Sequence, residues 1–204
     1  AGGNDGNGGA QSQGQVFTNN RDSFVGIEGG FGKVIAGRLA GLNQWVYDYN
    51  LFADQVGDLG SSIGASGLPG RASSAIMYST PDMGGLDIQI SFVPDENDND
   101  GDVQIIKANY RNAGFKLGLG HLNAGNATED HTASVVTGSY DFGQFSIGGL
   151  FQSESDAGGV KGNDIETFSL GASAKIGEIT TFKVQYFDRD ADAADADSDG
   201  WAVG

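Results

Sequence analysis

Three carboxylates near the end of the sequence have a spacing that suits a hard metal ion. Asp195, Asp197 and Asp199 precede Gly200 in the pattern D-x-D-x-D-G, which is the opening half of an EF-hand-type calcium loop. Alternate carboxylates can converge on Ca²⁺ or Mg²⁺, and the glycine permits a sharp turn. The bidentate glutamate of such a loop would stand beyond Gly204, and no helices are predicted on either side. An acidic loop that holds divalent cations loosely is therefore the alternative.

A second group combines residue types used in hydrolysis and in zinc binding. His121 and His131 flank one polar segment, with Asp130 and Ser134 nearby. Their spacing matches neither a Ser-His-Asp hydrolase motif nor a zinc motif, so the sequence favours surface-loop histidines. The chain has no cysteine, which removes thiol chemistry. No enzyme activity and no required cofactor are predicted.

The charge balance limits the partners. There are 27 acidic and 11 basic residues among 204, giving a net charge of −16. Nucleic-acid binding needs a basic surface, so nucleic acid is excluded as a partner.

Hydrophobic residues recur with a period of two along most of the chain. In 85–93, Leu86, Ile88, Ile90 and Phe92 share one face while polar residues occupy the other. This alternation is typical of half-buried β-strands. It predicts ten strands, at 21–28, 33–39, 71–80, 85–93, 102–111, 114–122, 131–142, 144–153, 164–176 and 179–189.

The predicted connections alternate in length, which indicates an antiparallel meander with two different ends. Tight glycine turns alternate with longer acidic segments such as 94–101 and 190–200. A soluble sandwich would bury the apolar faces, whereas an outer-membrane barrel would turn them to lipid. Strand length, the small polar second face and the unequal ends favour the barrel.

Residues 21–92 carry a family resemblance. The stretch RDSFVGIEGGFGKVIAGR at 21–38 resembles the signature hairpin of Gram-negative general porins, which are trimeric, 16-stranded outer-membrane channels. YNLFADQVGDL at 49–59 is similar to their third extracellular loop, and 71–92 to the strands that follow it. After Arg38 the sequence continues Leu39-Ala40-Gly41, where many relatives have Thr-Pro nearby.

The resemblance implies that residues 40–70 fold into the lumen and constrict the pore. The acids of this loop, Asp48, Asp54 and Asp58, would face basic residues of the barrel wall. The first candidates for those wall residues are Arg38 and Arg71, which flank the loop at its two ends. Opposed charges across a narrow wet gap create a transverse field that orients dipolar solutes. Aromatic residues of the loop would pack against the wall or a neighbouring subunit. Strand parity adds further lumen-facing basic residues, namely Lys107, Arg111, Lys116, Lys175 and Lys183.

The fold class implied is all-β, a transmembrane antiparallel up-and-down β-barrel of the 16-stranded porin type. Residues 1–204 would be a single, partial porin domain covering about ten strands, placed by the resemblance as strands 4 to 13. An open sheet leaves unpaired edges in lipid, so further strands are expected. A true ten-stranded barrel, with a nearly filled lumen, is the alternative.

The implied function is passive diffusion of small hydrophilic solutes and ions through the bacterial outer membrane. The partners implied are a homotrimer, lipid and lipopolysaccharide, with Ca²⁺ or Mg²⁺ bridging acidic outer loops. The net charge of −16 predicts a cation preference, which basic residues at the constriction could reverse. A solute-specific porin and an outer-membrane barrel enzyme are the alternative functions.

Overall fold

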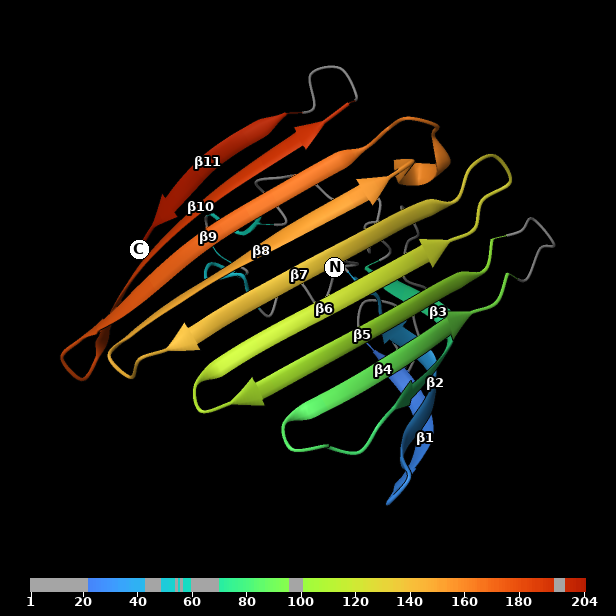
Figure 1. Cartoon of the computed structure of the whole chain (residues 1–204), viewed down its shortest axis with the longest axis horizontal. Coiled ribbons are helices and arrows are strands. Elements are labelled where there is room, and N and C mark those ends of the chain that lie inside the picture. The colour runs from blue at the N-terminus through green and yellow to red at the C-terminus, as the bar shows by residue number, and fades with distance from the viewer. Residues whose placement is uncertain are drawn as a thin grey trace, which may run out of the picture.

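The computed structural model is a single curved antiparallel sheet. It describes residues 22–42, 49–53, 55, 57–59, 70–95, 101–192 and 197–204. Eleven strands follow one another in chain order from β1 to β11, each hydrogen-bonded to the next (Figure 1). The strands are β1 (Ser23–Gly29), β2 (Gly32–Ala40), β3 (Arg71–Ser79), β4 (Leu86–Val93), β5 (Val103–Asn112), β6 (Phe115–Ala124), β7 (His131–Asp141), β8 (Phe145–Ser155), β9 (Ile165–Ile176), β10 (Thr180–Ala191) and β11 (Ser198–Val203).

The ten predicted strands are all present, but the end of the chain differs from the prediction. Residues 190–200 were expected to form one loop, whereas β10 continues to Ala191 and β11 begins at Ser198. Asp199 and Gly200 of the D-x-D-x-D-G pattern therefore lie in a strand, opposite Asp188 and Phe187. The period-two signal was missed because β11 is only 6 residues long and begins within the acidic run.

The two ends of the sheet differ as the sequence predicts. One end has tight turns, such as Asn112 to Phe115 between β5 and β6. The other end has longer connections, including one with a short 3-10 helix, η2 (Ala157–Gly159). Two of these longer connections are joined by an ion pair from Lys161 Nζ to Glu129 Oε1 at 2.8 Å. The hydrogen bond and charge of Glu129 raise the pKa of Lys161.

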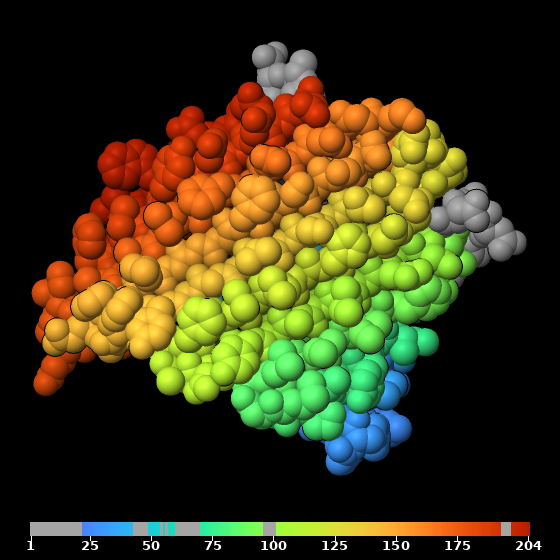
Figure 2. Space-filling model, in the orientation of Figure 1, coloured from blue at the N-terminus to red at the C-terminus, as the bar shows by residue number. Residues whose placement is uncertain are grey.

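The sheet has an apolar outward face. Large apolar side chains on β3 to β10 alternate with polar ones and remain exposed, although apolar surface in water is unfavourable. Figure 2 shows this face as a continuous surface. Its members include Ile76, Ile90, Ile106, Leu119, Val136, Ile147, Phe151, Phe168, Leu170 and Tyr186. Among the described residues, no helix is long and apolar enough to cross a membrane.

The opposite, inward face carries the connection between β2 and β3. Leu42 and Leu59 of that connection join Ile105, Leu122 and Val135 in one buried cluster, together with three further wall residues. In Figure 1 the described parts of the connection lie behind the sheet. Gly41 N donates to Gly70 O at 3.2 Å, which holds the two ends of the loop together. The loop therefore packs against the inward face through an apolar contact.

We expect Leu122→Ala to weaken this contact. Leu122 is fully buried at 0% exposure, so truncation leaves a cavity between the wall and the loop and costs about 2–5 kcal/mol. The midpoint of urea unfolding measures the loss. Leu119→Ala, on the outward face of the same strand, is the matched control and should cost less. Equal losses for the two variants would contradict this account of the cluster.

Candidate functional site

The loop roots bring Arg38 and Arg71 onto adjacent strands. Arg71 opens β3 opposite Ala40, and a bulge between Gly37 and Leu39 shifts the register beside Arg38. Arg38 Nη1 donates to Ser73 Oγ at 3.1 Å, and Arg71 Nε pairs with Asp22 Oδ1 at 2.6 Å. Both guanidinium groups therefore have contacts at the loop root. The role of these two residues at a constriction stays a prediction.

Two side chains of β10 hold the loop backbone at Leu51. Leu51 N donates to Gln185 Oε1 at 2.8 Å, and Lys183 Nζ donates to Leu51 O at 3.0 Å. Gln185 is only 2% exposed, and its Nε2 lies 3.4 Å from Asn50 Oδ1. Lys183 Nζ also lies 5.8 Å from the centre of the Phe52 ring. We call this arrangement of Gln185 and Lys183 around Leu51 the loop latch.

Asp58 is the one predicted pore acid among the described residues. It is buried at 8% exposure, and its Oδ1 accepts a hydrogen bond from Asn50 Nδ2 at 2.9 Å. The carboxylate is therefore buried and bonded within the loop, and its role at a constriction stays a prediction. Asp48 and Asp54, the other two predicted pore acids, lie outside the described residues.

Basic residues concentrate on the inward face. The register that joins Lys107 to Gln89, Ser79 and Lys33 gives all four the same face. The same alternation from β2 to β10 places seven basic residues inward. They are Lys33, Lys107, Arg111, Lys116, Lys175, Lys183 and Arg189. Lys107 is buried at 6% exposure, while Arg111 and Lys116 are exposed and stand directly opposite each other.

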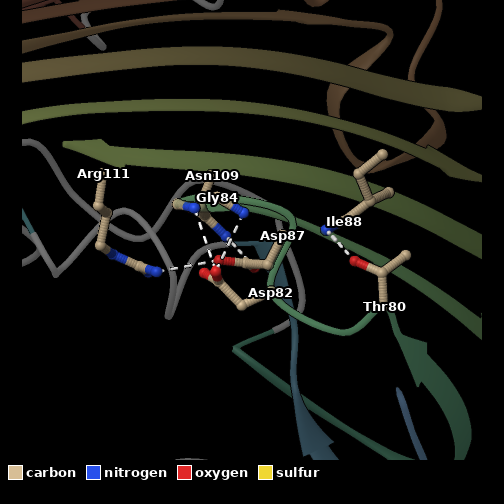
Figure 3. A network of polar contacts seen from close by, with 8 residues as sticks. Thr80, Asp82, Gly84, Asp87, Ile88, Asn109 and Arg111 are labelled. Atoms are coloured by element: carbon tan, nitrogen blue, oxygen red, sulfur yellow. Dashed lines mark hydrogen bonds and ion pairs between the residues drawn. The ribbon is translucent and has the colours of Figure 1, made fainter. Parts of the chain in front are cut away.

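Four carboxylates lie on the described inward strand face, fewer than the basic residues, and two of them are bonded to other side chains of that face. Asp87 Oδ1 pairs with Arg111 Nη1 at 2.9 Å, and Asp87 Oδ2 accepts from Asn109 Nδ2 at 3.0 Å (Figure 3). Glu154 is buried against His131. The other two are Glu28, opposite Lys33, and Asp141 at the end of β7. The described inward strand face thus has an excess of positive charge.

Near the connection between β10 and β11, the otherwise apolar outward face of β9 to β11 carries acidic residues in directly paired positions. Glu166 stands opposite Asp190, and Asp188 stands opposite Asp199. Like charges directly across a ladder are destabilising unless something screens them. Of the predicted metal ligands, Asp195 lies outside the described residues, and Asp197 Oδ1 accepts a hydrogen bond from Ala191 N at 3.0 Å. A cation bound by these acids stays a prediction.

The two histidines lie on opposite faces of the sheet, so the structure does not bring them together. His121 points outward, with Nδ1 2.9 Å from Ser134 Oγ. His131 is buried on the inward face at 4% exposure, with Nε2 3.0 Å from Glu154 Oε2. The prediction of surface-loop histidines is wrong for His131, because this residue begins strand β7 and its side chain is buried on the inward face.

Sequence reasoning missed the buried polar groups. Glu154 is 1% exposed, and its Oε1 accepts from Gln152 Nε2 at 2.6 Å. The alternation of side chains along a strand places three of these residues on the inward face, namely Gln152, Glu154 and Gln185. The sequence pattern alone could therefore have predicted their face. Their burial depends on what packs over them, which strand patterning does not encode.

Comparison with known proteins gives consistent matches. A family model described as Gram-negative porin matches residues 1–204. Outer membrane porin protein 32 of Delftia acidovorans is 30% identical over 200 residues, covering 88% of this chain and 57% of that protein. The solved anion-selective porin from Comamonas acidovorans has a TM-score of 0.67 at 26% identity, covering 88% of this chain and 59% of that one. A trimer form of OmpT of Vibrio cholerae has a TM-score of 0.60 at 18% identity, covering 88% and 62%.

Proposed function

Because this chain belongs to the Gram-negative porin family, and is thus part of an integral outer-membrane β-barrel protein, we propose that it forms a water-filled channel with an anion preference. The channel would pass small hydrophilic solutes and ions by passive diffusion. The chain spans 57% of the Delftia relative, so the activity of the whole protein belongs to this proposal.

The separation of the two faces supports a channel. The outward face is apolar, which suits contact with lipid, and the inward face carries Lys, Arg, Asp, Ser and Gln side chains. The loop latched to β10 narrows the space on the inward side. Charged and hydroxyl groups lining a narrow wet passage favour hydrophilic solutes over apolar ones.

The excess of basic residues on the inward strand face carries the anion preference. The net charge of −16 led to the opposite prediction, but outside the β2–β3 connection most described carboxylates lie in the other connections or on the outward face. Charges beside a narrow passage act on a permeating ion far more strongly than distant loop charges, because salt screens over about 10 Å at 0.1 M. The Comamonas porin, which is 26% identical to this chain, is anion-selective, and this supports an anion preference here.

The reversal potential of the full-length protein in a planar bilayer tests the preference. Under a KCl gradient centred near 0.1 M, we expect chloride to be more permeant than potassium, and the preference to shrink toward 1 M as screening increases. Potassium being more permeant would overturn the anion preference and restore the prediction from net charge.

A matched pair of variants locates the charges responsible. We expect Lys116→Glu to shift the reversal potential toward potassium, because Lys116 is an exposed cation on the inward face. Lys161→Glu makes the same change of charge in an outer connection and should shift it much less. Equal shifts would mean that the preference depends on total charge and not on the wall.

We further propose that the protein assembles as a homotrimer, as the solved trimer form of OmpT does. Stepwise closures in groups of three in single-channel records would support this assembly. Membership of a porin family points to a channel instead of an enzyme. A fluorophosphonate that labelled a serine would reopen the enzyme alternative.

A further inference from the structure

A cavity lies between the latched loop and the inward face of β6 to β9. Its volume is about 200 Å³. Among its lining residues are Leu51 of the loop and Lys116, Ser139, Asp141 and Ser146 of the wall, and we call this space the loop cavity. A water occupies roughly 30 Å³, so the loop cavity has room for about six or seven water-sized groups.

Several of the wall residues that form the floor of the loop cavity are glycine or serine. One row of directly paired positions runs Lys116, Ser139, Gly148, Gly171 and Gln185. A Cβ added at Gly171 would lie 2.7 Å from Leu51 Cδ1, so glycine there lets the loop approach closely. The next row contains Ser146 and Ser173, whose hydroxyls are 2.8 Å apart. Hydroxyl groups and bare backbone therefore form the floor.

The roof of the loop cavity is fixed in place. The loop latch restrains both the N–H and the carbonyl of Leu51, at 2.8 Å and 3.0 Å. Side chains of the roof and the floor thus face each other across a preformed space. A preformed space reduces the ordering cost of binding a small solute.

One cation and one carboxylate line the loop cavity without neutralising each other. In the described part of the chain, no ion pair within 4.0 Å joins Lys116 to Asp141. Ser139 is the directly paired partner of Lys116, and Asp141 lies two residues further along β7. Lys116 and Asp141 are therefore diagonal neighbours, whose Cα atoms are roughly 7–8 Å apart. Asp141 Oδ1 accepts from Gly143 N at 2.6 Å, while Oδ2 has no described partner.

The other nearby cations have other partners. Arg111, opposite Lys116, pairs with Asp87. Lys175 Nζ donates to Gly143 O at 3.1 Å, and Lys183 Nζ donates to Leu51 O. Lys116 is therefore the cation of this group that lines the cavity and has no described acceptor.

We propose that the loop cavity binds a small zwitterion of the α-amino-acid class. The solute carboxylate pairs with Lys116, its ammonium pairs with Asp141, and the hydroxyls of Ser139 and Ser146 bind its remaining polar atoms. Charge-assisted hydrogen bonds at both ends select a solute that carries both charges. A simple anion would be repelled by the carboxylate of Asp141, and a simple amine, which is a cation, would be repelled by the ammonium of Lys116. This inference rests on the proposed channel function and adds a solute class to it.

The test uses L-alanine as the probe in single-channel recordings of the full-length protein in KCl. Alanine has no net charge, so it carries no current and its binding appears as a saturable reduction of the ionic current. We expect propionate, which lacks the ammonium, and propylamine, which lacks the carboxylate, to reduce the current far less at equal concentration.

Two variants and two controls assign the site. Lys116→Met and Asp141→Asn should each weaken the alanine effect about tenfold or more. Asparagine keeps the Oδ1 acceptor for Gly143 N, so the turn is preserved. Lys33→Met and Glu28→Gln change a directly paired cation and carboxylate on the inward face outside the loop cavity, and should leave the effect unchanged.

The outcomes separate this inference from the channel itself. Ionic conductance without a saturable alanine effect would overturn the zwitterion site and leave the channel proposal standing. A propionate effect as strong as that of alanine, unchanged in Asp141→Asn, would show a plain anion site instead. Absence of ionic conductance from every protein tested would overturn the proposed channel as well.

Discussion

Gln185→Leu should turn a steady channel into a noisy one that closes at lower voltage. The substitution removes Gln185 Oε1, which accepts from Leu51 N, and Gln185 Nε2, which contacts Asn50 Oδ1. Gln185 is only 2% exposed, so water cannot easily replace these contacts. A buried donor left without a partner costs about 1–3 kcal/mol. Each 1.4 kcal/mol makes local opening of the loop roughly tenfold more frequent.

Current noise and closing voltage in planar bilayers measure this effect. Gln89→Leu is the matched control, because Gln89 lies on the inward face of β4, far across the sheet from β10. Lys183→Met removes the other half of the loop latch and should act in the same direction. If both latch variants behave as the wild type and Gln89→Leu do, the loop is held by other contacts.

Glu154→Ala should be the most destabilising of the substitutions considered for the wall. Glu154 is 1% exposed, and its two oxygens accept from His131 Nε2 at 3.0 Å and Gln152 Nε2 at 2.6 Å. Removing Glu154 leaves two buried polar side chains, His131 and Gln152, dehydrated and without this partner, at a cost of about 1–3 kcal/mol each. Urea unfolding of the protein in vesicles measures the loss.

Glu166→Ala is the control for this prediction. Glu166 is exposed on the outward face of β9, and exposed substitutions usually change stability by within about 0.5 kcal/mol. The double variant with His131→Ala should lose less than the sum of the single losses, because the pair acts as one unit. A loss for Glu154→Ala as small as that for Glu166→Ala would contradict a structural role for the pair.

The sequence alone predicted the strands and the family. Alternation of Leu86, Ile88 and Ile90 with polar residues identified β4, and the same rule identified nine other strands. The hairpin at 21–38 pointed to a porin, and the family match confirms it. These features are local, since alternation and turn residues are set by backbone geometry within a few residues.

The tertiary structure decided which polar residues face an open space and which are buried. The alternation along β10 predicts that Gln185 points inward. It does not predict the contact with Leu51, because the two residues are 134 apart in sequence. Asp58, expected at the pore, is buried against Asn50, and Lys116 lines a cavity formed only when the loop covers the wall. Alternation defines the face of a strand, whereas burial and partner depend on distant segments that the fold brings over that face.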